Sequence, residues 1–169
     1  CLRGGSVSLS ADIEEDIATN RIDEQLPGVR VTEGGIRRTD DGFAITEKTQ
    51  RKVAANELDG QFGDVNVRYV DVEQRDGGFG LTSGAEQEVA AAQIDTEFPG
   101  VDIGLREVGR RDDDSFGLSG FGRRAVAAED IEQDIGIDVS PGDVVADGDD
   151  FTLGDDFIDD NRDALEELQ

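Results

Sequence analysis

Apolar residues return along this chain in one fixed frame. The frame has three positions, and the first of them recurs after 36, 36 and 37 residues. Within a set the positions stand about one helical turn apart with polar residues between them, which is typical of an amphipathic helix. We therefore expect four such helices, with anchors at Ile17, Ile22 and Leu26; Val53, Leu58 and Phe62; Val89, Ile94 and Phe98; and Val126, Ile131 and Ile135.

Each predicted helix has recognisable ends. Ser or Thr stands near three of the starts, and Ser83 with Glu86 fits a capping box. Glycine, alone or after proline, follows the last anchor, where it acts as a C-terminal stop. An acidic residue also follows the middle anchor in every copy, at Asp23, Asp59, Asp95 and Glu132.

Apolar and polar residues alternate after each helix stop. A period of two predicts a strand in a sheet with one face in water. The alternating apolar residues are Val29 and Val31; Val65, Val67 and Tyr69; Val101, Ile103 and Leu105; and Ile137 and Val139.

A turn rich in Asp and Gly comes next, for example Arg75-Asp76-Gly77-Gly78, and it leads into a Phe-x-Ile/Leu triplet. Asp and Gly tolerate the positive φ that tight hairpin turns need. We expect each triplet to form the second strand of a hairpin. The triplets begin at Phe43, Phe79, Phe116 and Phe151.

Together these elements form a repeat of helix, strand, hairpin turn and strand. The repeats are 11–46, 47–82, 83–119 and 120–154, with a flexible tether at 1–10 and a capping helix at 155–169. Neighbouring repeats should stack, because none can bury its apolar stripe alone. We expect a two-layer α+β fold with the helices on one face of a mixed sheet. The order β-α-β-β-α-β is that of ferredoxin-like folds, so one continuous sheet and two ferredoxin-like halves both remain open.

The charge composition indicates the environment in which the protein is stable. The chain has 41 acidic and 16 basic residues, a net charge of −25, and only Lys48 and Lys52 as lysines. Self-repulsion of this kind destabilises a compact state in dilute buffer, whereas a Debye length of roughly 3 Å at about 1 M salt removes most of it. This composition resembles that of proteins from extreme halophiles, haloarchaea in particular, and an ordinary acidic protein is the alternative. Nucleic acid is disfavoured as a partner, because it needs basic patches.

Residue types for catalysis are scarce. The chain has no His, the commonest general base, and its one Cys, Cys1, lacks a His partner. It also has no Walker, GxSxG or GxGxxG motif. We name no catalytic residue and predict that the protein is not an enzyme, with a piece of a larger enzyme as one alternative.

Ion or ligand binding is the other alternative. The Asp-rich turns offer the oxygen ligands that calcium takes, at Asp112, Asp113, Asp114, Asp147, Asp149 and Asp150. An EF-hand loop counted from Asp143 fails, because Val145 stands at its third position and Gly154 at its twelfth. Asp is also favoured in hairpin turns for backbone reasons, so calcium binding and a plain solvated turn both stay open. A small-molecule site on the face of Gly80 and Gly117 is a second form of this alternative.

Clustered arginines are the candidate interaction residues. The planar guanidinium forms two parallel hydrogen bonds with a carboxylate, so these side chains can pair with acids of neighbouring repeats or of another subunit. Local exposed salt bridges, which contribute little, are the alternative. The candidates are Arg37, Arg38, Arg75, Arg110, Arg111, Arg123 and Arg124.

The start of the sequence bears on location. There is no Met, and Cys1 is followed by a small, polar stretch. This resembles a mature lipoprotein with a lipid anchor at Cys1, and a chain cut at this point by chance is the alternative. The lipid would be the only membrane contact, because no stretch is apolar enough to span a bilayer. We predict a non-enzymatic structural or interaction repeat protein of a halophilic archaeon, on the cell surface or in a virion or surface appendage, with protein partners or self-assembly.

Overall fold

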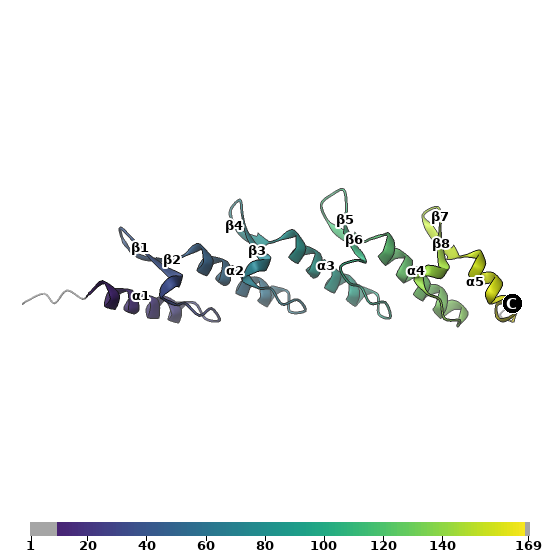
Figure 1. The fold of residues 1–169 in the computed structure, drawn as a ribbon, viewed down its shortest axis with the longest axis horizontal. Helices are drawn as coiled ribbons and strands as arrows, with labels where there is room; N and C mark the ends of the chain where they lie inside the picture. Colours follow the sequence, from purple (N-terminus) through teal and green to yellow (C-terminus); the bar gives the residue numbers. More distant parts are fainter. Residues whose placement is uncertain (1–9, 168–169) are drawn as a thin grey trace, which may run out of the picture. The chain divides into compact units, whose positions relative to one another are not determined.

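A computed structural model describes residues 10–167 of the 169-residue chain. Helices alternate with β-hairpins along the chain (Figure 1). The four long helices are α1 (Ala11–Gln25), α2 (Glu47–Gln61), α3 (Ser83–Glu97) and α4 (Gly120–Ile135). The predicted lipid anchor at Cys1 and the predicted tether up to residue 9 lie outside the described residues.

The same elements follow each long helix. An extended stretch leads into a tight turn, which is a 3₁₀ helix at η1 (Glu33–Gly35), η2 (Tyr69–Asp71) and η3 (Pro141–Asp143). A hairpin then completes the repeat. The hairpin strands are β1 (Ile36–Thr39), β2 (Gly42–Ile45), β3 (Val72–Arg75), β4 (Gly78–Leu81), β5 (Val108–Arg110), β6 (Phe116–Leu118), β7 (Val144–Asp147) and β8 (Asp150–Leu153).

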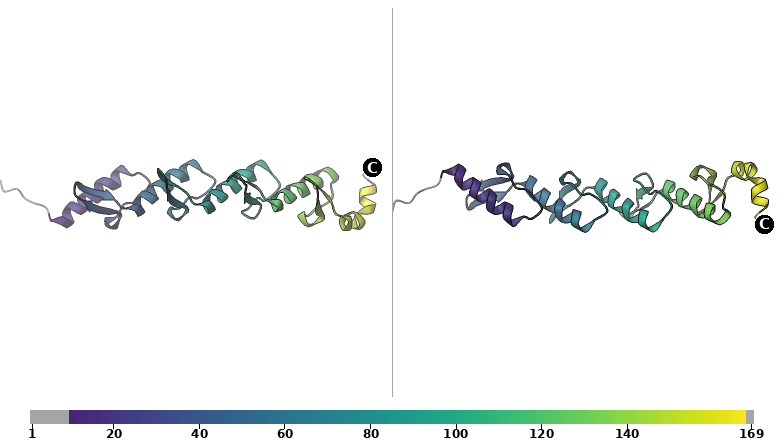
Figure 2. Two further views of the ribbon diagram at one scale, coloured as in Figure 1. Left: turned by 90° about the horizontal axis from the view of Figure 1, so that it is seen from above. Right: turned by 90° about the horizontal axis from the view of Figure 1, so that it is seen from below.

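The chain divides into two compact units, residues 1–82 and 83–169, and each contains two repeats. In both views of Figure 2 each hairpin lies beside the helix of its own repeat. The second unit ends in two short helices, α5 (Asp155–Asp160) and α6 (Arg162–Glu166), rather than in the single predicted capping helix. The break falls at Asn161, whose φ of −115° and ψ of 15° are not those of an α-helix.

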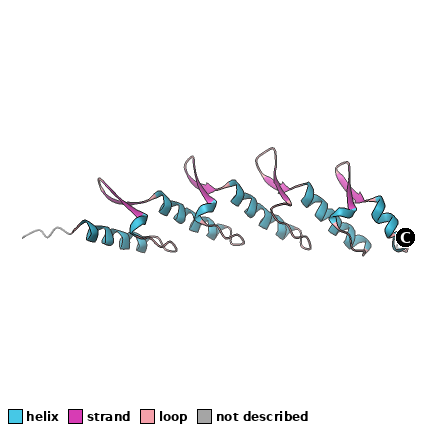
Figure 3. Ribbon diagram, in the orientation of Figure 1, coloured by secondary structure: helices cyan, strands magenta, loops and turns pink. Residues whose placement is uncertain are grey.

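Each hairpin is a sheet of its own. β1 pairs with β2, β3 with β4, β5 with β6 and β7 with β8, all antiparallel and each in a separate two-stranded sheet (Figure 3). The prediction of one mixed sheet, in either ferredoxin-like form, is therefore wrong. The α+β class and the four repeated helix–hairpin units are confirmed.

The predicted first strands explain this difference. The alternating stretches are extended, but among the described residues they belong to no sheet. Their alternation reflects burial alone: Val29, Val31, Val67, Ile103 and Val139 are all buried. The true first strand of each hairpin comes later and, at three or four residues, is too short to stand out in sequence, as in Val72-Glu73-Gln74-Arg75.

The base of each hairpin, where its first strand begins and its second strand ends, lies at the core. The first residue of each hairpin is buried: Ile36, Val72, Val108 and Val144 have relative exposures of 6%, 1%, 3% and 1%. Each pairs with the Ile or Leu that ends the Phe-x-Ile/Leu triplet. The Asp-rich turns stand at the other end of the hairpin and are exposed.

The core is a series of small local clusters. In the second unit, one cluster joins Ala91, Ile103 and Val108, and Val126 of the next helix packs against it. The other cluster joins Ala128, Val139, Val144 and Phe157. A small buried residue stands two positions after the first anchor of each helix, at Thr19, Ala55, Ala91 and Ala128, and it allows the extended stretch to approach the helix closely.

Candidate functional site

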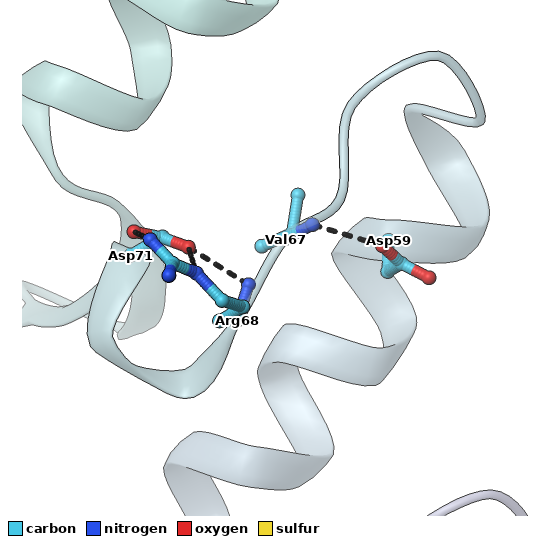
Figure 4. A network of polar contacts seen from close by, with 4 residues as sticks. All are labelled: Asp59, Val67, Arg68 and Asp71. Carbon is cyan, nitrogen blue, oxygen red and sulfur yellow. Dashed lines mark hydrogen bonds and ion pairs between the residues drawn. The ribbon is translucent and has the colours of Figure 1, made fainter.

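The acidic residue after the middle anchor has a structural role in every repeat. Its side chain reaches from the helix to the backbone of the extended stretch, as Asp59 does toward Val67 in Figure 4. Asp23 Oδ1 accepts from Val31 N at 2.6 Å, Asp59 Oδ1 from Val67 N at 2.9 Å, Asp95 Oδ1 from Ile103 N at 2.9 Å and Glu132 Oε2 from Val139 N at 3.0 Å. We call these four side chains the helix carboxylates. Each holds one backbone amide of the extended stretch against the helix.

A second carboxylate holds the tight turn in three repeats. Asp71 accepts from Arg68 N at 2.9 Å, Glu107 from Gly104 N at 3.2 Å and Asp143 from Ser140 N at 2.9 Å. In repeat one the same position is Gly35, where a side chain would meet Thr49 Oγ1 at 2.8 Å. These acids are therefore structural parts of the turn.

Hydrogen bonds shift the pKa of two of these turn acids. Burial raises the pKa of Asp71, but the hydrogen bonds from the side chain and backbone of Arg68 outweigh it, so the pKa lies below its ordinary value. The pKa of Asp143 is also lowered, first by the hydrogen bond from the Ser140 hydroxyl and then by that from its amide. Both carboxylates are charged at neutral pH.

The start of the following helix fixes the turn from the other side. Thr46 N donates to Gly35 O, Thr82 N to Asp71 O, Ser119 N to Glu107 O and Gly154 N to Asp143 O, at 2.7–2.9 Å. The hydroxyls of Thr46 and Ser119 cap their helices by accepting from the amides of Thr49 and Gly122. Ser83, predicted to cap its helix, is instead the first residue of α3.

The candidate calcium ligands lie at the exposed tips of the third and fourth hairpins. Asp113 accepts from the amide and hydroxyl of Ser115, and these bonds, the hydroxyl one first, lower its pKa. Asp114 pairs with Arg110 at 3.2 Å and adopts a positive φ of 66°. Within residues 10–167 no three Asp, Glu, Cys or His side chains come together in a way that would hold a metal ion. Asp112, Asp147, Asp149 and Asp150 are also exposed.

The candidate arginines lie on the hairpins and at the start of α4. Arg38 forms an ion pair with Glu14 and lies over the Phe43 ring, and Arg75 pairs with Glu73 at 3.2 Å. These pairs, like that of Arg110, join residues of a single repeat. Arg37 and Arg123 are exposed, and Arg124 is partly buried.

The face of Gly80 and Gly117 is covered by arginine side chains. A Cβ on Gly80 would lie 2.9 Å from the Arg75 side chain, and one on Gly117 would lie 2.2 Å from that of Arg111. Both arginines belong to the same hairpin as the glycine they cross. The glycines thus make room for an arginine of their own repeat.

Sequence reasoning missed the exposed apolar residues on the tight turns. Tyr69 is 42% exposed, Val70 51%, Leu105 49% and Phe121, at the start of α4, 54%. The alternating pattern predicts that Tyr69 and Leu105 face inward, which is wrong because the extended stretch ends at the residue before each of them and the tight turn begins there. The available signal was Val70, an apolar residue at a place where the alternation calls for a polar one.

In the described part of the chain no helix is long and apolar enough to cross a membrane. Comparisons with models of protein families, with curated proteins and with solved structures gave no match to this chain.

Proposed function

We propose that this chain is a non-enzymatic interaction protein whose repeats bind other proteins through their tight turns. The observation that carries this proposal is a difference between equivalent turns. The second and third repeats expose Tyr69, Val70 and Leu105, whereas the first and fourth have Glu33-Gly34 and Pro141-Gly142 at the same place. Exposed aromatic and large aliphatic side chains are typical of protein contacts.

The contacts that hold these turns in place support the proposal. The second turn is held by Asp71 on one side and by Thr82 N on the other. In the third turn the guanidinium of Arg106 lies 4.3 Å from the centre of the Phe121 ring, a cation–π arrangement. A fixed turn loses little conformational entropy when a partner binds, which favours affinity.

The charge supports a setting in concentrated salt. With a net charge of −25, the chain repels other acidic surfaces until salt screens the charges. In concentrated salt, apolar contact is then the main attraction between this surface and a partner, because salt does not screen apolar contacts. We place the protein on the cell surface, or in a virion or surface appendage, of a halophilic archaeon.

Photo-crosslinking in molar KCl tests the proposal. A photoreactive phenylalanine derivative replaces Tyr69 or Leu105, and the matched control places it at Glu33, the equivalent position of the first turn. We expect a discrete crosslinked protein at positions 69 and 105 that is absent at position 33. Equal crosslinking at all three positions, or none at any, would contradict the proposal.

Two further measurements separate the alternatives. Sedimentation velocity over a concentration series in molar KCl shows whether the partner is a second copy, since the tight-turn variants Tyr69→Ser and Leu105→Ser should then weaken self-association. Calorimetric titration with calcium in the same salt tests the ion-binding alternative. Binding heat that disappears when the six candidate Asp residues become Asn would favour that alternative instead.

A further inference from the structure

Helix α1 carries an apolar face that its counterparts in the other repeats do not expose. Ile13 is 47% exposed and Ile17 38% exposed. Ile13 is the third residue after the cap Ser10, and the same position after the other caps is occupied by Thr49, Ala85, Gly122 and Phe157, all buried. The exposure of Ile13 is thus a departure from a rule that the rest of the chain follows.

Contacts within each unit show what covers this position elsewhere. Thr49 Oγ1 donates to Gly35 O at 2.8 Å, on the turn of the preceding repeat. At Gly122 a Cβ would lie 2.3 Å from Glu107 O and 2.8 Å from Leu118 Cδ2, again in the preceding repeat. The position therefore faces the turn and hairpin base of the repeat before it.

The first anchor shows the same relation. Val126, the counterpart of Ile17, packs against the Ala91, Ile103 and Val108 cluster of the preceding repeat. The groove between α4 and its hairpin is lined by Phe98 and Leu118 of the preceding repeat as well as by Val126. The matching groove of repeat one, about 580 Å³, is lined by residues of repeat one alone, including Ile17 and Phe43.

We propose that the Ile13 and Ile17 face of α1 is a docking surface for another helix–hairpin repeat of this kind, joined to α1 in the same chain through Ser10. The opposite end of the repeats argues against a second copy as the occupant. Phe157, at the position equivalent to Ile13, packs with Val139 and Val144 in the buried cluster of the fourth repeat. The hairpin base of that repeat is therefore already covered.

The sequence just before α1 points to the same occupant. The string Arg3-Gly4-Gly5-Ser6-Val7-Ser8-Leu9-Ser10 matches Arg75-Asp76-Gly77-Gly78-Phe79-Gly80-Leu81-Thr82 in its arginine, third-place glycine, apolar fifth residue, leucine and hydroxyl residue, 72 positions apart. That spacing is two repeat lengths. The sequence of residues 3–9 thus carries the end of a repeat pattern.

Hydrogen exchange of α1 compared with α2 tests the proposal. Both helices have 15 residues and a hydroxyl cap, so they are matched in length and start. In the 169-residue chain we expect α1 amides to exchange at least about tenfold faster, because the α1 face lacks its cover. In an extended chain, with residues 83–119 joined to Ala11 in place of residues 1–10, α1 exchange should slow to the α2 rate.

Variants and controls decide the outcome. Ile17→Ser should speed α1 exchange about tenfold or more in the extended chain, where it removes a buried side chain, and less than about threefold in the 169-residue chain. The same repeat attached after Gln169 should leave α1 unchanged. The proposal is overturned if α1 is already as protected as α2, if the extended chain leaves α1 exchange fast, or if protection rises with protein concentration, which would identify a second copy.

Discussion

At the scale of single residues, two buried threonines differ in whether their hydroxyls are hydrogen-bonded. The Thr49 hydroxyl donates to Gly35 O at 2.8 Å. The Thr19 hydroxyl is equally buried, and among the described residues it has no hydrogen-bond partner. Equivalent positions to Thr19 hold Ala55, Ala91 and Ala128. A buried polar group without a partner destabilises a fold by its desolvation, while a satisfied one adds a modest net stability.

The same substitution at these two positions should therefore have opposite effects. Thr19→Val keeps the shape and removes the unpaired hydroxyl, so the free energy of unfolding should rise by about 1 kcal/mol. Thr49→Val removes the hydroxyl that donates to Gly35 O and lies 3.2 Å from the Thr46 hydroxyl, and it should lower the free energy of unfolding by about 1 kcal/mol. Urea unfolding in molar KCl measures both. Changes of equal sign would show that packing, and not the hydroxyl, decides.

The Ser140 hydroxyl offers a test of the turn carboxylates. Its hydrogen bond is the main cause of the lowered pKa of Asp143, so Ser140→Ala should raise that pKa toward the ordinary value of about 3.9. Because the folded pKa lies below the unfolded one, this bond stabilises the fold above the unfolded pKa and is lost as pH falls through the folded pKa. NMR titration of the carboxyl carbons measures the shift. Asp113, held by Ser115, serves as the unchanged control, and Ser140→Thr should restore the low value.

At the scale of elements, one carboxylate in each repeat fastens the extended stretch to its helix. The helix carboxylates bond a backbone amide eight residues ahead in three repeats and seven ahead in the fourth. The fourth repeat has Glu132 where the others have Asp. Glu132 and Val139 are one residue closer in sequence than the other pairs, and the longer Glu side chain reaches the Val139 amide at 3.0 Å.

Removing a helix carboxylate should loosen the extended stretch. Asp95→Ala leaves Ile103 N without its acceptor, so the free energy of unfolding should fall by about 1 kcal/mol and the Ile103 amide should exchange faster than in the parent. Glu88→Ala, at an exposed position of the same helix, is the matched control. In the fourth repeat Glu132→Asp should have the effect of Asp95→Ala on Val139. Unchanged exchange at Ile103 would show that packing alone holds the stretch.

The elements also show what the sequence could predict. The helices, the Asp-rich turns and the second hairpin strands depend on local patterns, and each is found at its predicted place. The sheet does not depend on local pattern, since Val31 looks the same in sequence whether a strand or the Asp23 carboxylate takes its amide. The regular recurrence of Asp23, Asp59, Asp95 and Glu132 was visible in sequence, but its meaning required the side-chain geometry.

The candidate site was less predictable for the same reason. Tyr69 and Leu105 continue the apolar alternation, and only the tight turn brings them to the surface. The arginines were visible, but their partners, such as Glu14 of α1 for Arg38, follow from the packing within each repeat. Residue type indicated that each side chain takes part in contacts, whereas three-dimensional placement determines the partner.

At the scale of the whole molecule, charge and small cores act against each other. The buried clusters are local and consist mainly of Ala, Val and Ile, while the net charge of −25 opposes compaction. The ion pairs Arg38–Glu14, Arg75–Glu73 and Arg110–Asp114 are exposed, and each lies within one repeat, so they contribute little. Screening by dissolved ions is then the main means of reducing the repulsion.

Stability should therefore rise with salt. Between 0.1 M and 1 M KCl the Debye length falls from about 10 Å to about 3 Å, so we expect most of the gain in this interval, at least about 2 kcal/mol in the free energy of unfolding or about 4–8 °C in the midpoint. Changing Asp112, Asp147, Asp149 and Asp150 to Asn removes four charges and should reduce the dependence on salt. Thermal and urea unfolding over a KCl series measure both chains, with sucrose as an uncharged control. Stability that stays flat or falls with KCl would mean that charge does not limit this fold and would remove the physical basis for placing it in concentrated salt.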